Sequence, residues 1–433
     1  MGVKLMTHQQ VGFDSLKNFK NVGAFWDMGT GKTFLGAELA INYALPIMVV
    51  CQKSKVTDWC KHFEENYHCN VIDLTTKKGF DEFGNISSDT LNGDTHNITV
   101  GVINYDIIFR RQFNIKNFTL ILDESSEIQN DTNKRCKAIF KLNADHVILL
   151  TGTPFSKGYE KLWSQCHLLG WKIDKKLFLQ HYCEYGYKTD WRGNKMLSPS
   201  GRPIKEIVGY KNLDRLKYKM KQYGASFLKT EDVIDLPTQT EIPIYIPFTK
   251  EYKKFLKDKI IQIDDTTLVG DMSTKIYLYK RYLCGAYNPH KLEALKDLIN
   301  STDDRLIIFY MYNNELEAIK SVIPEDRPIS EVNGHTKDLD AYEKCDNSIT
   351  LCQFQSASKG LNLQKVNKII YFCVTNRSED WQQSLKRIHR IGQSQPCFYY
   401  YLQTDFDKQI LDVVKTGKDY LDYLYEGGIQ NET

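Results

Sequence analysis

The 433-residue sequence lacks several features that would assign it to a class of protein at once. It has no apolar run of the length that a bilayer-spanning helix needs, so we expect no membrane partner. Its formal net charge is only +3, so any surface that attracts nucleic acid has to be local. No apolar signal stretch follows the first residues. We therefore expect an intracellular protein, cytoplasmic in a bacterium or a phage-infected cell and nuclear in a eukaryote.

Cysteine pairing of the kind that marks zinc ribbons or redox sites is also missing. The chain has eleven cysteines, but no two of them form a Cys-x-x-Cys pair. The spacings within Cys51, Cys60, His62, His68 and Cys69 fit no common zinc finger. We predict reduced structural thiols rather than a metal site, which favours a reducing compartment.

Short apolar runs recur along both halves of the chain between polar, helix-like segments. Each run has four to six residues, is rich in β-branched residues or leucine, and does not alternate with polar residues. Strands buried on both faces of a parallel sheet have this pattern. The runs are 47–50, 98–103, 119–122, 147–150, 306–309, 349–353 and 369–372. We predict an α/β fold with two tandem parallel sheets, in domains 1–235 and 236–433.

The segment between the two halves has a different composition. Residues 194–230 hold nine Lys or Arg and two Asp or Glu, and we expect a helical, basic insertion near 155–230. A solvated helical face and a nucleic-acid contact surface both remain possible for it. Its interleaved aromatic residues are Tyr210, Tyr218, Tyr223 and Phe227. Asp235-Leu236-Pro237 follows and predicts a hinge, because proline disfavours helix at the preceding residue.

A phosphate-binding loop is predicted near the N-terminus, just before a helical pattern. Small residues there let backbone N–H groups surround a phosphate at the start of a helix. Lys32 would neutralise phosphate charge, and Thr33 would hold Mg²⁺. Trp26 stands where the usual pattern has its first glycine. The predicted contacts with ATP in this loop are Met28, Gly29, Thr30, Gly31, Lys32 and Thr33.

Two carboxylates complete the predicted nucleotide site. The apolar run at 119–122 ends in Asp123 and Glu124. An aspartate at a strand tip can bind Mg²⁺, and a neighbouring glutamate can orient and deprotonate the attacking water. An Asp-Glu pair after a strand is usually a solvated loop, but the upstream phosphate loop favours the catalytic interpretation.

The order of these motifs resembles helicase superfamily 2, and within it the Swi/Snf-type branch. Residues 5–9 resemble the motif whose glutamine reads adenine, a role that falls on Gln9. Residues 150–154 resemble the motif that couples hydrolysis to lobe movement, with Thr151, Gly152 and Thr153 as the coupling residues. Ser126 replaces the histidine of the family's Asp-Glu-x-His motif.

The same resemblance implies contacts with a DNA backbone. Residues 51–54 and 104–106, and the run 358–363 in the second half, are similar to three further motifs of the branch. Gly360 in the last run is implied to contact ATP. The implied DNA contacts are Lys53, Ser54, Asn104, Tyr105, Ser358 and Lys359.

The most specific resemblance is the run from Gln383 to Gln393. On a helix, Gln383, Arg387 and Arg390 would share one face, because they stand at positions i, i+4 and i+7. An arginine on this face would stabilise charge in the phosphoryl-transfer transition state. Arg390 is the predicted finger, with Arg387 beside it, and a salt-bridged surface helix is the structural alternative.

Together these resemblances imply two RecA-like lobes with helical insertions between them. The implied activity is a DNA-dependent ATPase that uses ATP and Mg²⁺ and translocates on double-stranded DNA. A monomer is expected, with a separate protein for targeting. A strand-separating DNA or RNA helicase and a non-catalytic DNA-binding scaffold are the alternatives.

Overall fold

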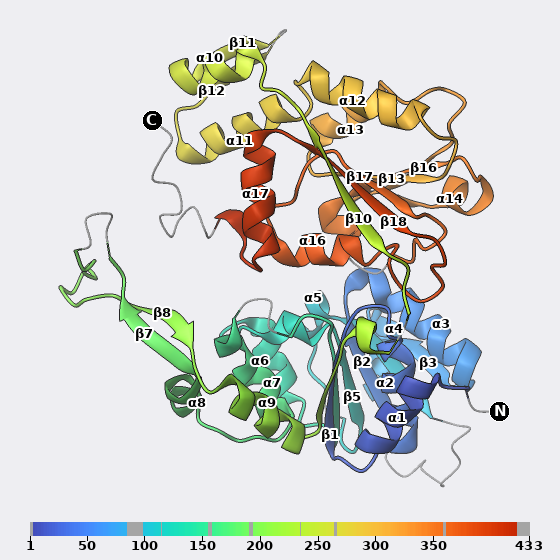
Figure 1. Cartoon of the computed structure of the whole chain (residues 1–433). Coiled ribbons are helices and arrows are strands. Elements are labelled where there is room, and N and C mark those ends of the chain that lie inside the picture. The colour runs from blue at the N-terminus through green and yellow to red at the C-terminus, as the bar shows by residue number, and fades with distance from the viewer. Residues whose placement is uncertain are drawn as a thin grey trace. The chain divides into compact units, whose positions relative to one another are not determined.

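The computed structural model describes residues 3–84, 98–113, 115–154, 158–189, 194–233, 235–263, 266–357 and 361–421. The chain forms two compact units, Met1–Ile234 and Asp235–Thr433, each built on its own sheet (Figure 1). Within the described ranges, no helix is both long and apolar enough to cross a membrane.

The first unit has a seven-stranded sheet in the order β3-β4-β2-β5-β6-β1-β9, and every pairing in it is parallel. The carboxyl ends of its strands therefore lie at one edge, where loops can converge. The strands are β1 (Asn21–Trp26), β2 (Ile47–Cys51), β3 (Asn70–Asp73), β4 (Thr99–Asn104), β5 (Thr119–Asp123), β6 (His146–Leu150) and β9 (Ala225–Leu228).

Helices cover both faces of this sheet. One face packs on α1 (Thr7–Leu16), α2 (Lys32–Asn42) and α3 (Val56–Tyr67), and the other packs on the remaining helices. These are α4 (Lys77–Gly84), α5 (Tyr105–Ile108), α6 (Lys134–Lys141), α7 (Trp163–Leu168), α8 (Lys175–Tyr182) and α9 (Leu213–Gln222). Short 3₁₀ turns are η1 (Lys53–Lys55), η4 (Ser125–Ile128), η5 (Tyr159–Leu162) and η6 (Thr230–Asp232).

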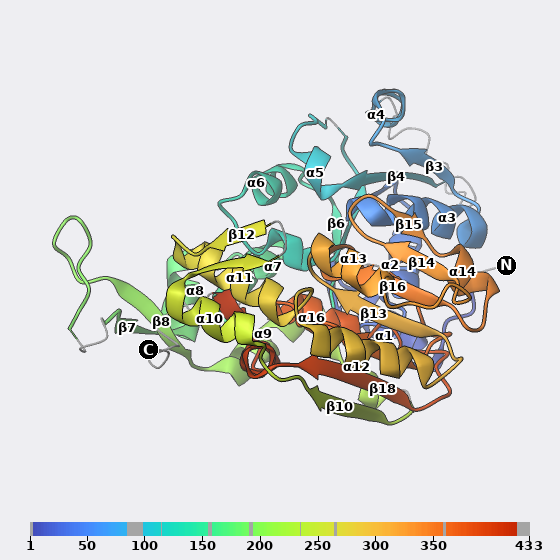
Figure 2. The same cartoon turned by 90° about the horizontal axis from the view of Figure 1, so that it is seen from above.

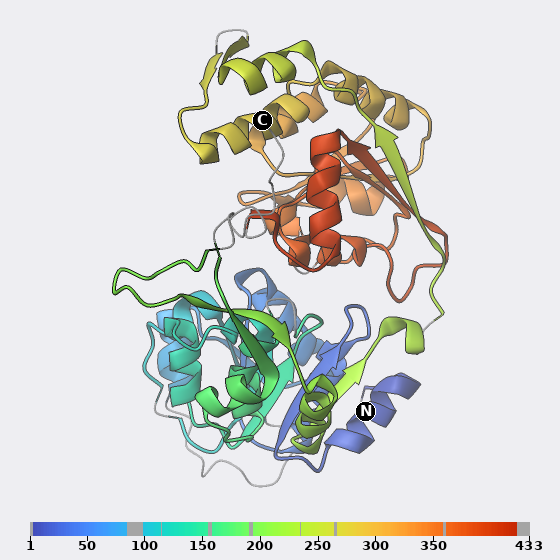
Figure 3. The same ribbon diagram turned by 60° about the vertical axis from the view of Figure 1, so that its left-hand side comes forward.

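The basic insertion of the first unit contains a β-hairpin as well as helices. Strands β7 (Cys183–Tyr187) and β8 (Lys205–Tyr210) pair antiparallel between α8 and α9 and extend beyond the helices around them (Figures 1 and 3). Lys195 lies 4.1 Å from the ring centroid of Tyr187 on this hairpin. The sequence did not predict the hairpin, because its strands are short and largely exposed.

The second unit repeats the parallel α/β arrangement. Its sheet has the order β10-β18-β17-β13-β16-β14-β15, and only the β14–β15 pair is antiparallel. The strands are β10 (Gln239–Tyr245), β13 (Leu306–Tyr310), β14 (Ile329–Val332), β15 (Lys337–Asp338), β16 (Ile349–Gln353), β17 (Lys368–Tyr371) and β18 (Cys397–Gln403).

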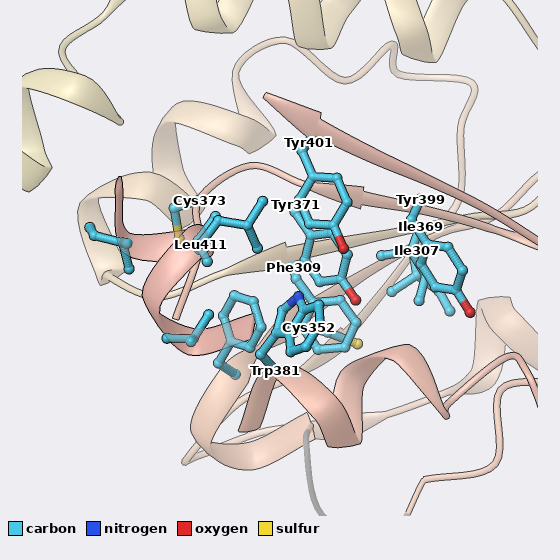
Figure 4. Packing of buried hydrophobic residues seen from close by; sticks show 14 of the residues in the cluster. Ile307, Phe309, Cys352, Ile369, Tyr371, Cys373, Trp381, Tyr399, Tyr401 and Leu411 are labelled. Carbon is cyan, nitrogen blue, oxygen red and sulfur yellow. The ribbon is translucent and has the colours of Figure 1, made fainter. Parts of the chain in front are cut away.

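Aromatic side chains fill one face of the second sheet (Figure 4). Tyr371 stacks on Tyr401 with ring centroids 4.8 Å apart, and its hydroxyl bonds Ser384 Oγ at 2.8 Å. This face packs on α14 (Asp340–Lys344), α16 (Ser378–Leu385) and α17 (Asp405–Lys415), and α12 (Pro289–Asn300) and α13 (Asn313–Lys320) cover the other face. The element α15 (Phe354–Ala357) follows β16.

A second insertion precedes α12 in this unit. It consists of α10 (Lys250–Asp258), a hairpin of β11 (Ile260–Ile263) and β12 (Thr266–Val269), and α11 (Ser273–Cys284) (Figure 2). Buried charge attaches α11 and α12 to α17. Asp407 accepts from Lys291 Nζ at 2.7 Å and from Arg281 Nη1 at 3.4 Å. Burial opposes ionisation of Asp407, but these two cations outweigh it and hold the pKa of the carboxyl below its ordinary value.

Candidate nucleotide site

Three strand ends bring the predicted catalytic residues of the first unit together. Strands β5, β6 and β1 are neighbours, and they lead into Glu124, Thr151 and the phosphate loop respectively. Thr151 Oγ1 donates a 3.2 Å hydrogen bond to Glu124 Oε2. A Cβ placed on Gly152 would lie 3.5 Å from Lys32 Nζ. The phosphate loop, the carboxylate motif and the coupling motif therefore form one site.

The phosphate loop has the backbone that its glycines predict. Gly29 and Gly31 have φ of +84° and +76°, a region that side-chain-bearing residues rarely occupy. Gly31 is also the N-cap of α2, and no side-chain hydrogen bond caps that helix start. Helix α2 thus begins directly after the loop, with half-buried Thr33 in its first turn.

Backbone carbonyls hold the ammonium of Lys32. Its Nζ donates to the carbonyl of Trp26 at 2.8 Å and to that of Asp27 at 3.0 Å. Thr30 Oγ1 donates to the Asp27 carbonyl at 2.7 Å, which tightens the same turn. The turn itself therefore holds the lysine in place.

The structure explains why Trp26 can replace a glycine. Trp26 is the last residue of β1, an extended position that any residue can adopt. Its ring is buried against Gly12 of α1, and its Nε1 donates to Ser226 Oγ of β9 at 3.0 Å. The side chain points away from the loop into the core, so the substitution leaves the phosphate cradle intact.

Gln9 is attached to the phosphate loop. Its Nε2 donates to the carbonyls of Thr30 and Gly31 at 3.2 and 3.3 Å, and its Oε1 accepts from Met6 N at 2.8 Å. The neighbouring His8 bonds the Thr30 carbonyl through Nε2 at 2.9 Å, a contact that the sequence did not predict. Both ends of the Gln9 amide are engaged, and its role in reading adenine stays a prediction.

Glu124 is held in a strained backbone conformation. Its φ and ψ are +55° and +59°, in the left-handed region that costs a non-glycine residue about 1 kcal/mol or more. Thr151 bonds its carboxylate, as described above. Strain at a glutamate beside a phosphate loop is typical of a catalytic position, where the fold fixes the direction of one side chain.

Residues close to Ser126, which replaces the family's histidine, make hydrogen bonds to other parts of the site. Ser126 is buried, and its neighbour Ser125 donates from Oγ to Gln165 Oε1 at 3.1 Å. Gln129 Nε2 donates to the carbonyl of Pro154, at the end of the coupling motif, at 3.0 Å. The carboxylate and coupling motifs are thus joined through Thr151 and Gln129.

The predicted DNA contacts of the first unit divide into exposed and buried pairs. Lys53 and Ser54 lie exposed on η1. Asn104 and Tyr105 are only 2% and 3% exposed, so their side chains do not offer the surface for a DNA strand that the sequence predicted. Asn104 is the last residue of β4 and Tyr105 is the first residue of α5. Ser358, Lys359 and Gly360 lie outside the described residues.

The prediction that Gln383, Arg387 and Arg390 share one helical face was wrong. Helix α16 ends at Leu385, and the N–H of Arg387 bonds the Ser384 carbonyl at 3.2 Å in a tighter turn. The side chain of Gln393 stabilises this turn, because its Nε2 donates to three backbone carbonyls. These are the carbonyls of Gln364, Val366 and Ile388, at 3.2, 2.9 and 3.3 Å.

The two arginines meet on one carbonyl instead. Arg387 Nη1 and Arg390 Nη1 donate to Leu361 O at 3.0 and 3.5 Å. Arg387 is 5% exposed, whereas Arg390 is partly exposed and also bonds Asn362 Oδ1. Burial lowers the pKa of Arg390 from its ordinary value. Gln383 is buried on α16, where its Nε2 donates to Glu379 Oε1 at 3.2 Å.

Comparison with known proteins assigns the family. The SNF2-related domain matches residues 6–292, and the helicase conserved C-terminal domain matches residues 290–392. The chain belongs to the SNF2-related family. The first match contains the phosphate loop and both carboxylates, and the second contains Arg387 and Arg390.

Relatives of this SNF2-related chain come from eukaryotes and bacteria. A mouse SWI/SNF-related matrix-associated actin-dependent regulator of chromatin, subfamily A member 1, is 23% identical over 88% of this chain and 39% of its own length. An uncharacterized ATP-dependent helicase of Mycoplasma pneumoniae is 22% identical over 89% of this chain and 40% of its own length. The chain thus spans about two fifths of the length of these curated relatives.

Among solved structures, the Sulfolobus solfataricus SWI2/SNF2 ATPase core in complex with dsDNA is similar to this chain. The TM-score is 0.43 and the identity 18%, over 99% of this chain and 94% of the other.

The SNF2-related site fits ATP and Mg²⁺ on its own geometry. Lys32 and the start of α2 match a polyphosphate, since they combine a cation with the positive end of a helix. Thr33 and Asp123 would supply oxygen ligands of the kind that Mg²⁺ prefers. When bound, the metal would neutralise charge on the phosphate oxygens.

Two residues of this site escaped the sequence analysis as functional positions. Trp59 Nε1 donates to Asp123 Oδ2 at 2.8 Å. Thr230 donates from Oγ1 to the Met28 carbonyl at 3.2 Å and from its N–H to Asp27 Oδ2 at 3.3 Å. Trp59 follows the motif at 51–54 and Thr230 ends the basic segment 194–230, but only the fold shows that they reach the nucleotide site.

Proposed function

We propose that the chain is a DNA-dependent ATPase that translocates on double-stranded DNA. The hydrogen bond between Thr151 and Glu124 carries this proposal, because it joins the predicted coupling motif to the predicted general base. The names of its relatives, among them an ATP-dependent helicase, support use of ATP.

The predicted catalytic residues of the first unit have separate tasks in the proposed reaction. Lys32 leaves its two carbonyls to neutralise phosphate charge, and the N–H groups at the start of α2 bind phosphate oxygens. Asp123 and Thr33 would hold Mg²⁺. Glu124 orients the attacking water and accepts its proton, and Thr151 keeps the Glu124 carboxylate in position.

Arg390 is the proposed transition-state arginine of the second unit. Its guanidinium is partly exposed and bonded to groups that it can leave, Leu361 O and Asn362 Oδ1. Buried Arg387 then has a supporting task, because it shares the Leu361 carbonyl and shapes the turn. An arginine finger contributes on the order of 10³ to 10⁵ in rate.

The proposed track is a DNA backbone, which suits a motor that must move over any sequence. Exposed Lys53 and Ser54 on η1 are one contact. A second is the solvated side of α9, where Lys217 and Lys221 are exposed and Tyr218 is 62% exposed. The opposite side of α9 is anchored by buried Leu216 and Met220. Phosphate contacts of this kind weaken steeply with salt.

The motor acts as a monomer, and a separate protein directs it to its DNA. It works in the cytoplasm of a bacterium or a phage-infected cell, or in a nucleus if its source is eukaryotic.

Glu124→Gln tests the proposed chemistry. This change keeps the size of the side chain but removes the base, so turnover falls at least 100-fold while binding of ATP with Mg²⁺ persists. Glu127→Gln, which breaks an ion pair with Arg135 (2.9 Å) in the same loop, is the matched control and keeps turnover within about threefold. Full turnover by folded Glu124→Gln protein would overturn the assignment.

A further inference from the structure

Asp123 is held by two hydrogen bonds, one to its carboxylate and one to its backbone carbonyl. The indole of Trp59, on α3, donates to its carboxylate oxygen Oδ2 at 2.8 Å. The hydroxyl of Tyr105, at the start of α5, donates to its backbone carbonyl at 3.0 Å. Trp59 and Tyr105 are 2% and 3% exposed, so neither bond competes with bulk water.

Both donors are chemically suited to a fixed carboxylate. An indole N–H can only donate, so it occupies one oxygen of Asp123 and leaves Oδ1 for a ligand. The Tyr105 hydroxyl donates its one hydrogen bond to the backbone carbonyl of the same aspartate. Carboxylates that bind metals generally need such partners to keep their orientation.

Helix α3 packs on neighbouring aromatic rings where it carries Trp59. The Trp59 ring stacks on Phe63 with centroids 5.8 Å apart. The rings of His62 and Phe34 meet edge-on, with their centroids 4.7 Å apart. Phe34 lies on the first turn of α2, directly after Lys32 and Thr33. The helix is thus packed against the start of α2 as well as bonded to Asp123.

The same helix begins at a proposed DNA contact. Lys53 and Ser54 are exposed on η1, and Val56, the C-cap of η1, is the first residue of α3. The ion pair between Lys55 and Asp58, 2.8 Å long, spans this junction. Less than two helical turns of continuous structure therefore separate the proposed phosphate contact from the indole that holds Asp123.

We propose that Trp59 is a positioning residue that orients Asp123 for Mg²⁺ and relays contact of η1 with DNA to the metal site. This inference rests on the proposed function, since it assumes that Asp123 binds Mg²⁺ and that η1 touches DNA. Tyr105 holds the backbone of the same aspartate. DNA bound at η1 restrains the start of α3, fixes the indole and so favours the metal-binding orientation of the carboxylate.

Trp59→Phe tests this role, because it keeps an aromatic ring while it removes the N–H donor together with part of the ring volume. The readout is binding rather than turnover: Mg²⁺ is titrated into protein with fluorescent ADP, with and without duplex DNA. The expected result is a roughly tenfold or greater rise in the Mg²⁺ concentration at half-saturation, with unchanged ADP affinity in EDTA. Duplex DNA lowers this concentration for the parent protein but not for Trp59→Phe.

Trp163→Phe is the matched control. The Trp163 indole also donates one hydrogen bond, to the Ile173 carbonyl at 2.9 Å, but it lies on α7 across the sheet from α3. The Trp163→Phe variant should leave the Mg²⁺ concentration at half-saturation unchanged. Tyr105→Phe serves as the second variant if Trp59→Phe fails to fold, and it should raise the Mg²⁺ requirement in the same direction.

The outcomes separate this inference from the proposed function. If the parent protein shows no Mg²⁺-dependent binding of ADP, the proposed nucleotide site fails and the inference fails with it. If the parent protein shows such binding and both Trp59→Phe and Tyr105→Phe match it, only the positioning role is overturned. A DNA effect that persists in Trp59→Phe overturns the relay.

Discussion

A Cβ added to Gly12 of α1 would lie 2.5 Å from Cζ2 of Trp26. The residue that replaces the usual first glycine of the phosphate loop is therefore accommodated by a glycine on the neighbouring helix. Gly12 has helical backbone and no need of a positive φ. Its missing side chain makes room for the indole that underlies the loop.

Gly12→Ala should therefore destabilise the first unit, because a close-packed core has no space for the added methyl group. We expect a loss of about 1 to 3 kcal/mol in the free energy of unfolding, measured by denaturant titration. Gly84→Ala is the control, since a Cβ there meets nothing within 4 Å. Equal stability of Gly12→Ala and Gly84→Ala would contradict the packing described here.

Thr151→Val should slow ATP turnover without weakening ATP binding. The change removes the 3.2 Å hydrogen bond to Glu124 and keeps the shape of the side chain. A bond to a charged group contributes about 1.5 to 3 kcal/mol, so a loss of about 10- to 100-fold in kcat is expected. Thr151→Ser keeps the hydroxyl and should retain most of the activity. A rise in KM alone, with unchanged kcat, would place Thr151 in binding instead.

Protonation of His62 should lower the free energy of unfolding in acid. Burial lowers the pKa of His62 to about 4, whereas an unfolded chain has the ordinary value of 6.5. Between these values the unfolded state binds the extra proton, so stability is full above about pH 6.5 and is lost as the pH falls towards 4.

His62→Phe should remove this part of the pH dependence, which amounts to roughly 2 to 3 kcal/mol. The measurement is the free energy of unfolding at several values between pH 4 and 7, for the parent and the variant. His335→Asn, at an exposed histidine of the second unit, is the control and should follow the parent curve. A parallel shift of the His62→Phe curve at every pH would show that packing alone is affected.

Charge reversal of Lys217, Lys219 and Lys221 on α9 should raise the DNA concentration needed for half-maximal stimulation of ATP turnover. Each lost phosphate contact also makes the slope of log K against log salt concentration less steep by about one. Reversal of exposed Lys253, Lys254 and Lys257 on α10 changes the net charge equally and is the control. If both triple variants weaken DNA binding alike, net charge rather than a contact on α9 is responsible.

The sequence predicted the elements whose burial is simplest. Runs such as 119–122 and 349–353 became β5 and β16, because strands covered on both faces need continuous apolar residues. Strand β18 was missed, since its tyrosines alternate between core and partial exposure. The β7–β8 hairpin was missed because it contributes little to any core.

The candidate site could be predicted where chemistry is local and not where it depends on packing. Lys32, Asp123 and Glu124 follow from loop and strand-end chemistry. The contact between Trp59 and Asp123 joins residues 64 positions apart and follows only from the order of the strands. The helical face expected for Arg387 failed because side-chain bonds from Gln393 favour a turn over a continued helix.

The central claim is most directly tested by steady-state ATP hydrolysis of the purified protein at one salt concentration. No nucleic acid, single-stranded DNA, blunt duplex DNA, forked DNA and duplex RNA are compared. Duplex or forked DNA should stimulate turnover strongly, with little effect of RNA and no displacement of a labelled strand. Equal turnover with and without nucleic acid, or stimulation by RNA alone, would contradict a motor that runs on double-stranded DNA.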